Sequence, residues 1–157
     1  MLNDMENTGP KLSEADISLL ETSVGKKLPT EYEAFLIRYN GGAPVECELE
    51  FDGKKLGVSG ETIGYFFGIG RKSDIFDKLD NLSYLLPKNM IPIADTPAGN
   101  VFLLSVNEKS YGYIYYKDHE IEDSHEFDDS KSKLPESMVL VANSFSEFLG
   151  KLYDPDE

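Results

Sequence analysis

The chain has 157 residues and carries 29 Asp and Glu against 15 Lys and Arg, which gives a formal net charge of −14. That charge excludes direct binding to nucleic acid or to an anionic membrane, because both repel a surface of the same sign. A hydrophobic content of 40%, with 9 Tyr and 9 Phe, is sufficient for the core of one domain.

The sequence also bears on location and domain limits. A single cysteine, Cys47, leaves no internal disulfide. The first residues have no basic stretch followed by an apolar run, and the apolar stretches are too short to span a bilayer. We therefore expect a cytoplasmic protein without a signal peptide, with a lead over residues 1–12, one domain over 13–152 and an acidic tail over 153–157.

Two amphipathic helices are predicted first. Ser13 can cap the first helix, and Gly25 is a good terminator for it. Pro29 suits the first turn of the second helix, which should end at Asn40-Gly41-Gly42. Apolar residues recur along one face of each helix and are expected in the core: Ile17, Leu20 and Val24, then Tyr32, Phe35, Leu36 and Tyr39.

Residues 45–52 alternate between apolar and acidic side chains, which is typical of a strand with one buried face. The apolar residues Val45, Cys47, Leu49 and Phe51 should face inward, with a hairpin turn at Asp52-Gly53. The outer face would then carry Glu46, Glu48, Glu50 and Asp52, with successive carboxylates about 7 Å apart. Like charges so placed repel one another, and Glu is a poor strand former. This face is either a solvated surface or a binding surface for a basic partner.

The remaining elements are read from the same signals. They are a strand over 63–67, a helix from Asp74 to Leu86, an edge strand over 91–94, strands over 101–106 and 111–116 joined by a hairpin at 107–110, a polar connection over 118–133, a strand over 139–142, and a helix capped by Ser144 and Glu147. Helices that bracket hairpin-linked strands predict a single α+β domain, with a largely antiparallel sheet and flanking helices.

The excess negative charge is confined to three stretches. Besides the four acidic residues of 45–52 and three in the tail, seven lie in the polar connection: Asp118, Glu120, Glu122, Asp123, Glu126, Asp128 and Asp129. The stretches 45–52, 118–129 and 153–157 contain no Lys or Arg, so together they account for the whole net charge. The rest of the chain is electrically balanced.

Signs of catalytic chemistry are scarce. Residues 68–73 lack the spacing of a phosphate-binding loop and are better explained as a turn before the next helix. His119 and His125 are the candidate metal ligands, but their spacing does not place both on one helical face. We expect them to be ordinary loop residues, and we expect no metal, cofactor or catalytic group. Cys47 lies between two Glu residues and should be an inert thiol with a raised pKa.

Four segments in sequence resemble the motifs of the SMI1/KNR4 family, also called the SUKH superfamily. They are Leu-Pro-Thr-Glu-Tyr at 28–32 running to Asn-Gly-Gly at 40–42, Ile-Pro-Ile-Ala-Asp at 91–95 with Gly99-Asn100, the stretch from Gly112 to Glu120, and the stretch from Ala142 to Leu149. Their order and spacing cover most of residues 13–152. The chain departs from the pattern at Thr96-Pro97-Ala98, and it has Tyr before Asp118 where relatives often have Trp.

The resemblance implies an α+β domain without a catalytic site and, in bacteria, an immunity protein that neutralises a cognate toxin, frequently a nuclease. A nuclease holds a polyanion in a positive cleft, so clustered carboxylates can imitate the phosphate backbone. We expect the four carboxylates of 45–52 and the seven of 118–129 to face the toxin, with Tyr115 or Tyr116 as an apolar anchor at the rim. The alternative is a regulatory or scaffold protein that binds a host partner, and a hydrolase is the least favoured class.

Overall fold

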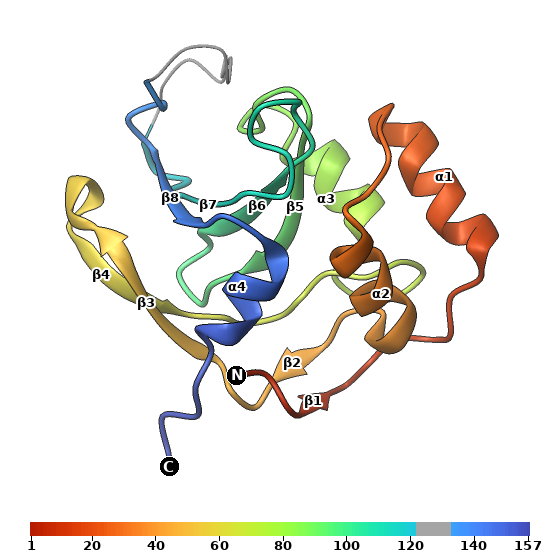
Figure 1. Ribbon diagram of the computed structural model, residues 1–157, viewed down its shortest axis with the longest axis horizontal. Coiled ribbons are helices and arrows are strands. Elements are labelled where there is room, and N and C mark those ends of the chain that lie inside the picture. Colours follow the sequence, from red (N-terminus) through yellow and green to blue (C-terminus); the bar gives the residue numbers. More distant parts are fainter. Residues whose placement is uncertain (122–132) are drawn as a thin grey trace.

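The computed structural model describes residues 1–121 and 133–157 (Figure 1). Its elements are β1 (Met5–Glu6), α1 (Glu14–Val24), α2 (Thr30–Tyr39), β2 (Ala43–Pro44), β3 (Glu48–Gly53), a 3-10 turn (Lys54–Leu56), β4 (Val58–Thr62), α3 (Ile75–Asn81), β5 (Met90–Asp95), β6 (Val101–Ser105), β7 (Ile114–Lys117), β8 (Met138–Ala142) and α4 (Phe145–Gly150). Strands β5 to β8 form an antiparallel sheet in chain order, and β1–β2 and β3–β4 are separate antiparallel pairs. The predicted α+β class is confirmed.

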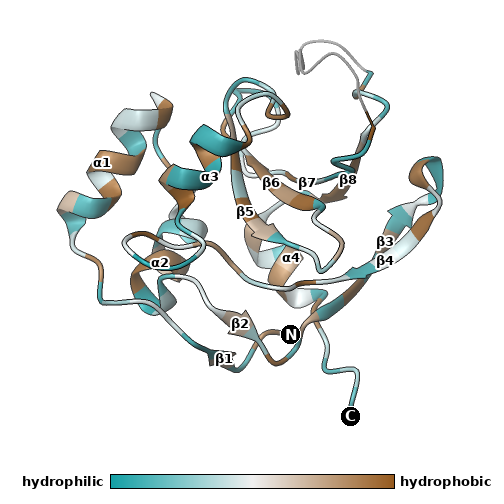
Figure 2. Cartoon of the chain, turned by 180° about the vertical axis from the view of Figure 1, so that it is seen from behind, coloured by the Kyte–Doolittle hydropathy of each residue, from teal (hydrophilic) through white to brown (hydrophobic). Residues whose placement is uncertain are grey.

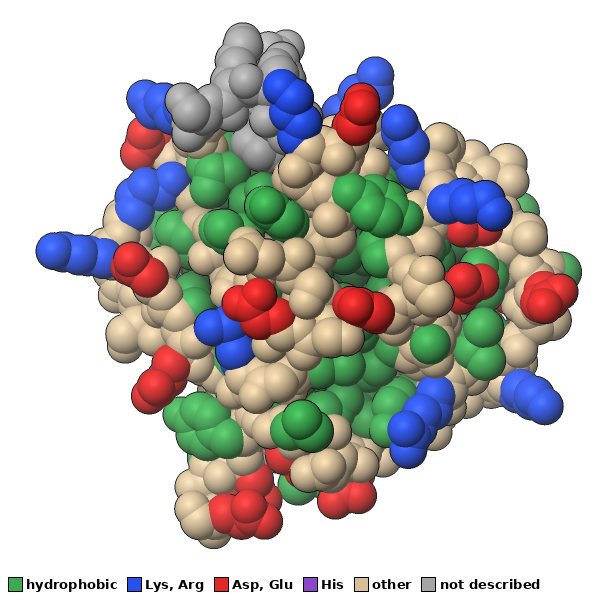
Figure 3. All heavy atoms as spheres, viewed as in Figure 1, with side chains coloured by type: hydrophobic (Ala, Val, Ile, Leu, Met, Phe, Trp, Pro, Cys, Tyr) green, Lys and Arg blue, Asp and Glu red, His purple; other side chains and the backbone are tan. Residues whose placement is uncertain are grey.

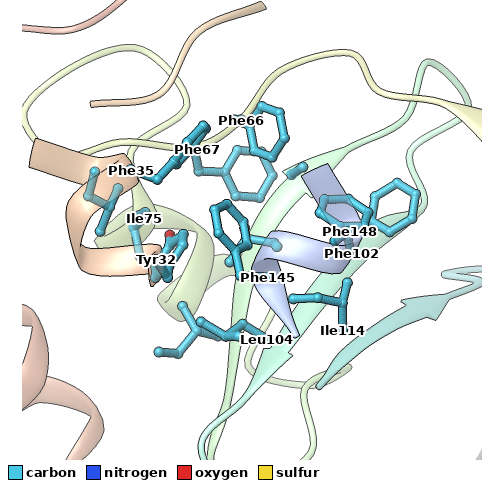
Figure 4. Close-up of a cluster of buried hydrophobic side chains, with 14 of the residues drawn as sticks. Tyr32, Phe35, Phe66, Phe67, Ile75, Phe102, Leu104, Ile114, Phe145 and Phe148 are labelled. Atoms are coloured by element: carbon cyan, nitrogen blue, oxygen red, sulfur yellow. The ribbon is translucent and has the colours of Figure 1, made fainter. Parts of the chain in front are cut away.

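One face of the four-stranded sheet carries the main core, which is rich in aromatic rings (Figure 4). Phe102 of β6 packs against Phe148 of α4, with ring centroids 5.2 Å apart, and against Phe51 of β3, at 6.2 Å. Phe145 of α4 meets Tyr32 of α2 edge to face at 5.1 Å. The sheet therefore holds α4, α2 and the β3–β4 hairpin through one continuous set of ring contacts.

The opposite face of the sheet carries a smaller apolar cluster of Met90, Val101, Leu103, Tyr115 and Met138. Successive residues of β6 point alternately to the two faces, so Phe102 and Leu104 join the main core and Val101 and Leu103 the smaller one. Every residue of β6 is buried, which explains the uninterrupted apolar run over residues 101–104.

The predicted helix ends are confirmed in most details. Ser13 accepts a hydrogen bond from the N–H of Asp16, and the Asp16 carboxylate accepts one from the N–H of Ser13, which completes a capping box at α1. Gly25 and Asn40 end α1 and α2 in the left-handed conformation. Pro29 lies at the position before the first residue of α2, not within its first turn.

Two strand predictions in the N-terminal half are wrong. The strand predicted over 45–52 begins only at Glu48, and residues 63–67 form no strand, since only Phe66 makes isolated bridges. The partner of β3 is β4, whose sequence Val-Ser-Gly-Glu-Thr lacks the apolar alternation of a strand. The chain reverses through the 3-10 turn after Gly53 instead of a two-residue turn at Asp52-Gly53.

Two later elements are shorter than predicted. Helix α3 ends at Asn81, and Leu82 and Leu86 pack beyond it against the smaller cluster. Strand β7 begins at Ile114, so the connection from β6 is longer than the predicted four residues. Strand β5 lies at the edge of the sheet, as its proline predicted.

Tyr32 provides a test of the core. It is fully buried, and among the described residues its hydroxyl has no hydrogen-bond partner. Tyr32→Phe should leave the free energy of unfolding unchanged or raise it by about 1 kcal/mol, because it keeps the ring and removes an unpaired polar group. Tyr32→Ala should lower it by about 3–5 kcal/mol by removing the ring. Urea unfolding measures both, and a loss of more than about 1 kcal/mol for Tyr32→Phe would show that the hydroxyl is hydrogen-bonded.

Candidate functional site

The β3–β4 hairpin projects from one side of the molecule (Figures 1 and 2), and its strand β3 carries three carboxylates. Leu49 and Phe51 of β3 are buried against the sheet. The alternating residues Glu48, Glu50 and Asp52 therefore point away from the core. We call these three residues the acidic face.

The acidic face has defined limits. Lys54 and Lys55 lie in the 3-10 turn directly beyond Asp52, whose carboxylate accepts a hydrogen bond from the N–H of Lys54 at 3.2 Å. At the other end of β3, the acidic tail extends the negative charge. Asp154 and Asp156 lie near enough to Cys47 for their charges to help raise the pKa of its thiol. In the space-filling view, acidic side chains lie along the lower left of the surface and around the C-terminal end (Figure 3).

A hollow of about 310 Å³ lies against the acidic face. Its lining residues are Glu48, Leu49, Glu50, Ser59, Gly60, Glu61, Thr62 and Tyr153. The hydroxyl of Thr62 donates to the Glu48 carboxylate at 3.3 Å, and that of Tyr153 does so at 3.4 Å. The lining contains carboxylates and hydroxyls but no His, Cys, Lys or Arg. It therefore suits an ammonium or guanidinium group better than nucleophilic catalysis.

Glu46 does not share the outward surface predicted for it. It is 8% exposed, and its carboxylate accepts hydrogen bonds from the backbone N–H groups of Asn3 and Asp4, the latter at 2.9 Å. The strand alternation begins only at Glu48, so the predicted inward and outward positions do not apply at 45–47. The Asn3 N–H lowers the pKa of Glu46, and partial burial acts in the opposite direction. Glu46 holds the N-terminal segment and lies outside the acidic face.

The predicted rim anchors, Tyr115 and Tyr116, are both buried, at 4% and 1% exposure. They point to opposite faces of β7, and because both faces of the sheet are covered, neither reaches the surface. The exposed aromatic residue beside the acidic face is Tyr153, at 42% exposure. Its backbone exchanges two hydrogen bonds with Glu48, of 3.1 and 2.8 Å. One signal in the sequence could have indicated the exposure of Tyr153. Leu152 is the last residue of the apolar pattern on the final predicted helix, and Tyr153 follows it directly.

A chain of hydrogen bonds attaches the hairpin to the sheet. Tyr116 donates to the Glu61 carboxylate at 2.6 Å, and the side-chain amide of Asn100 donates to the Tyr116 hydroxyl at 2.7 Å. The side-chain oxygen Oδ1 of Asn100 accepts the backbone N–H of His119 at 3.0 Å and lies 2.6 Å from His119 Nδ1. Burial, followed by the Glu61 carboxylate, raises the pKa of Tyr116. The position of the hairpin is therefore fixed by polar as well as apolar contacts.

Comparison with known proteins identifies the family of this chain. The profile of the SMI1 / KNR4 family (SUKH-1) matches residues 11–151. The chain belongs to this family. A relative in Bacillus subtilis (strain 168), the SPbeta prophage-derived uncharacterized protein YokK, is 31% identical over 166 residues, which cover 94% of this chain and 76% of that protein.

The structure explains part of the SMI1/KNR4 pattern in physical terms. Asn100 and His119 come from two of the segments that resemble the family motifs, and they meet in the hydrogen-bond chain. Gly99 has φ of 91°, and a Cβ there would lie 3.3 Å from the His119 ring. These motif residues thus position the segment after β7 and, through Tyr116, the hairpin.

The second acidic segment of this SMI1/KNR4 protein is described only at its start. Glu120 is exposed, and the Asp118 carboxylate accepts the N–H of Glu120 at 2.9 Å. The other predicted partner-binding residues of this segment, together with His125, lie outside the described residues: Glu122, Asp123, Glu126, Asp128 and Asp129.

The structure describes two of the other chemical candidates, His119 and Cys47. Across residues 1–121 and 133–157, no three His, Cys, Asp or Glu side chains group in a way that could hold a metal ion. Cys47 is a free thiol whose pKa is raised by burial and then by the charge of Glu48, as predicted. No helix in this part of the chain has both the length and the apolar character needed to cross a bilayer.

Glu46 gives a prediction with a defined pH dependence. Glu46→Gln should lower the free energy of unfolding near pH 7, because the amide is a weaker acceptor than the carboxylate. The pKa of Glu46 is lower in the folded state, so its stabilising contribution is present above the ordinary value of 4.5 and is lost as the pH falls through the folded-state pKa. Urea unfolding at several pH values should show the difference shrinking in acid. A difference that stays constant down to acidic pH would contradict this.

The hydrogen-bond chain gives a second prediction. Tyr116→Phe should lower the free energy of unfolding by about 1.5–3 kcal/mol, because it removes a bond to a carboxylate and leaves the buried Asn100 amide without that partner. Tyr84→Phe is the matched control, since Tyr84 is exposed, and it should have little effect. Equal stabilities of the two variants in urea would show that the chain of bonds contributes nothing.

Proposed function

We propose that this SMI1/KNR4 protein is an immunity protein that binds a cognate toxin in the cytoplasm and blocks it without turnover. The observation that carries the proposal is the acidic face of the projecting hairpin, in a chain whose excess negative charge is confined to three short stretches. Family membership supports a binding role, and the charge indicates the chemistry of the partner.

The acidic face is better explained by binding than by stability. Glu48 and Glu50 are neighbours on the same surface of β3, and their mutual repulsion disfavours the strand. Alternating Lys or Thr would serve a solvated face better. A basic partner would neutralise these carboxylates on binding. The repulsion that destabilises the free protein would then be relieved in the complex.

A nuclease is the toxin class that fits best. An enzyme that holds nucleic acid must present a positive cleft. The cationic side chains that bind phosphates there can also bind carboxylates spaced along a strand. Opposite fields also accelerate association, with rate constants up to about 10⁸–10⁹ M⁻¹s⁻¹ at low salt. The acidic face would then occupy the cleft, and the remaining carboxylates of the second segment would extend the contact.

An immunity gene should sit immediately downstream of the gene of its toxin, so the charge hypothesis is tested with the product of the gene directly upstream of this one. Glu48→Lys combined with Glu50→Lys should weaken binding at least about tenfold, mostly through a slower association rate. The association rate of the unmodified protein should also fall with added salt, and that of the variant should depend on salt much less. Surface plasmon resonance measures both quantities.

The matched control is Asp80→Lys combined with Glu108→Lys. Both residues are exposed and lie away from the hairpin, in α3 and in the connection from β6 to β7. This variant has the same net charge as the hairpin variant and should bind like the unmodified protein. If the hairpin variant keeps its affinity and salt dependence, or if both variants lose affinity equally, the acidic face is not the binding surface.

A further inference from the structure

The free edge of β4 is the second unusual feature of the hairpin. Within the described chain, β4 pairs only with β3, so one side of the strand has no neighbour. We infer that this edge receives an extended basic segment of the partner as an added β-strand. The inference rests on the proposed function, because it uses the acidic face to recognise the added strand.

The register of the hairpin determines which backbone groups are available. Ile63 donates its N–H to the carbonyl of Cys47 at 2.7 Å, so the pair two residues further along, Leu49 with Glu61, is also a hydrogen-bonded pair. The pairs that alternate with these, Glu48 with Thr62 and Glu50 with Gly60, direct their backbone groups away from the hairpin. Glu48 shows this directly, because its N–H and carbonyl bond to Tyr153 on the far side of β3.

The corresponding groups of β4 point to the free edge. Among the described residues, no backbone hydrogen bond from outside the hairpin reaches Gly60 or Thr62. The N–H of Thr62 has only a 3.3 Å contact with the side chain of Glu61. An edge with unpaired backbone groups can accept another strand, and β4 has neither Pro nor Lys to prevent it.

The side chains along the edge leave a route to the acidic face. Gly60 lies opposite Glu50, and a Cβ at Gly60 would come within 2.6 Å of the Leu49 carbonyl oxygen, so this position needs glycine. The outer surface beside Glu50 is therefore bare. An added strand lies about 4.8 Å beyond β4 and so about 9.6 Å from β3, a distance that a Lys or Arg side chain and the Glu50 side chain can cover together across the bare position. A second basic side chain two residues along can reach Glu48 across the short side chain of Thr62.

The charge distribution favours a basic segment over a second copy of this chain. The hollow over the hairpin is lined by Glu48, Glu50 and Glu61 and by no basic side chain. Pairing two β4 edges would combine the carboxylates of two such surfaces in one sheet, with no basic side chain in either hollow. The structure thus favours a strand with basic residues at alternate positions, as in a Thr-Lys-Thr-Lys repeat.

The test uses the full chain and a blocked peptide of sequence Thr-Lys-Thr-Lys-Thr-Lys-Thr at millimolar concentration. Amide exchange is followed by NMR. The N–H groups of Gly60 and Thr62 should exchange at least about tenfold more slowly with the peptide bound. A peptide of the same composition with its lysines in one block should give much less protection, because its charges cannot follow the strand alternation. Exchange at Gly60 and Thr62 that is unchanged by the alternating peptide would overturn the inference.

A pair of variants provides an independent check. Thr62→Pro removes an outward N–H that the hairpin does not use, whereas Thr62→Val keeps it. The proline variant should lose at least about tenfold in affinity for the peptide, and the valine variant should retain it. Equal affinities would overturn the inference, as would a dimer in light scattering that protects the same amides. If the Glu48→Lys, Glu50→Lys variant fails to bind the toxin while Thr62→Pro binds normally, the proposed function stands and strand addition is wrong. If the peptide adds to β4 but the protein does not bind the toxin, strand addition stands and the proposed function is wrong.

Discussion

Aromatic packing on one face of the four-stranded sheet determines where the rest of the molecule lies. Phe102 contacts α4 and the hairpin, and Phe145 joins α4 to α2. Full burial of such a side chain is worth about 1.5–3 kcal/mol, so the ring contacts together outweigh the local cost of any single polar arrangement. Once Phe51 lies against the sheet, strand alternation requires Glu48, Glu50 and Asp52 to face outward.

This constraint allows the hairpin to carry a charged surface that does not stabilise it. The inner side of β3 is held by Leu49 and Phe51, and β4 is held by the bond from Tyr116 to Glu61. The outer side is therefore free to be selected for binding. The free edge of β4 and the bare position at Gly60 lie beside the acidic face. A partner bound as proposed would therefore contact the carboxylates and the unpaired backbone groups together.

The sequence predicted the parts of the fold that depend on local signals. Capping residues, helix periodicity and the apolar strands β5, β6 and β8 identified the α+β class, and the motif order identified the family. Strand β4 could not be predicted, because its pairing depends on β3 and not on its own residues. Residues 63–67 lie beside β5 and share backbone hydrogen bonds with Ile93 and Asp95 but form only isolated bridges, an arrangement that periodicity cannot distinguish from a strand.

The candidate site was predicted only in part, because some of its contacts join residues that are distant in sequence. Glu48, Glu50 and Asp52 follow the strand period, and their outward direction is confirmed. Glu46 breaks the pattern because its partners, Asn3 and Asp4, lie more than forty positions away in sequence. The burial of Tyr115 and Tyr116 could not be predicted from their own positions. It depends on both faces of β7 being covered, which is a property of the whole sheet.

The most direct measurement of the central claim is hydrogen exchange along the whole chain, free and bound to the product of the adjacent gene. The acidic face and the β4 edge lie within residues 47–62, whereas α1 and α3 lie elsewhere on the chain and serve as internal references. The account predicts that exchange slows in 47–62 on binding and stays unchanged in α1 and α3. Slowing in α1 or α3, with 47–62 exchanging as in the free protein, would contradict it.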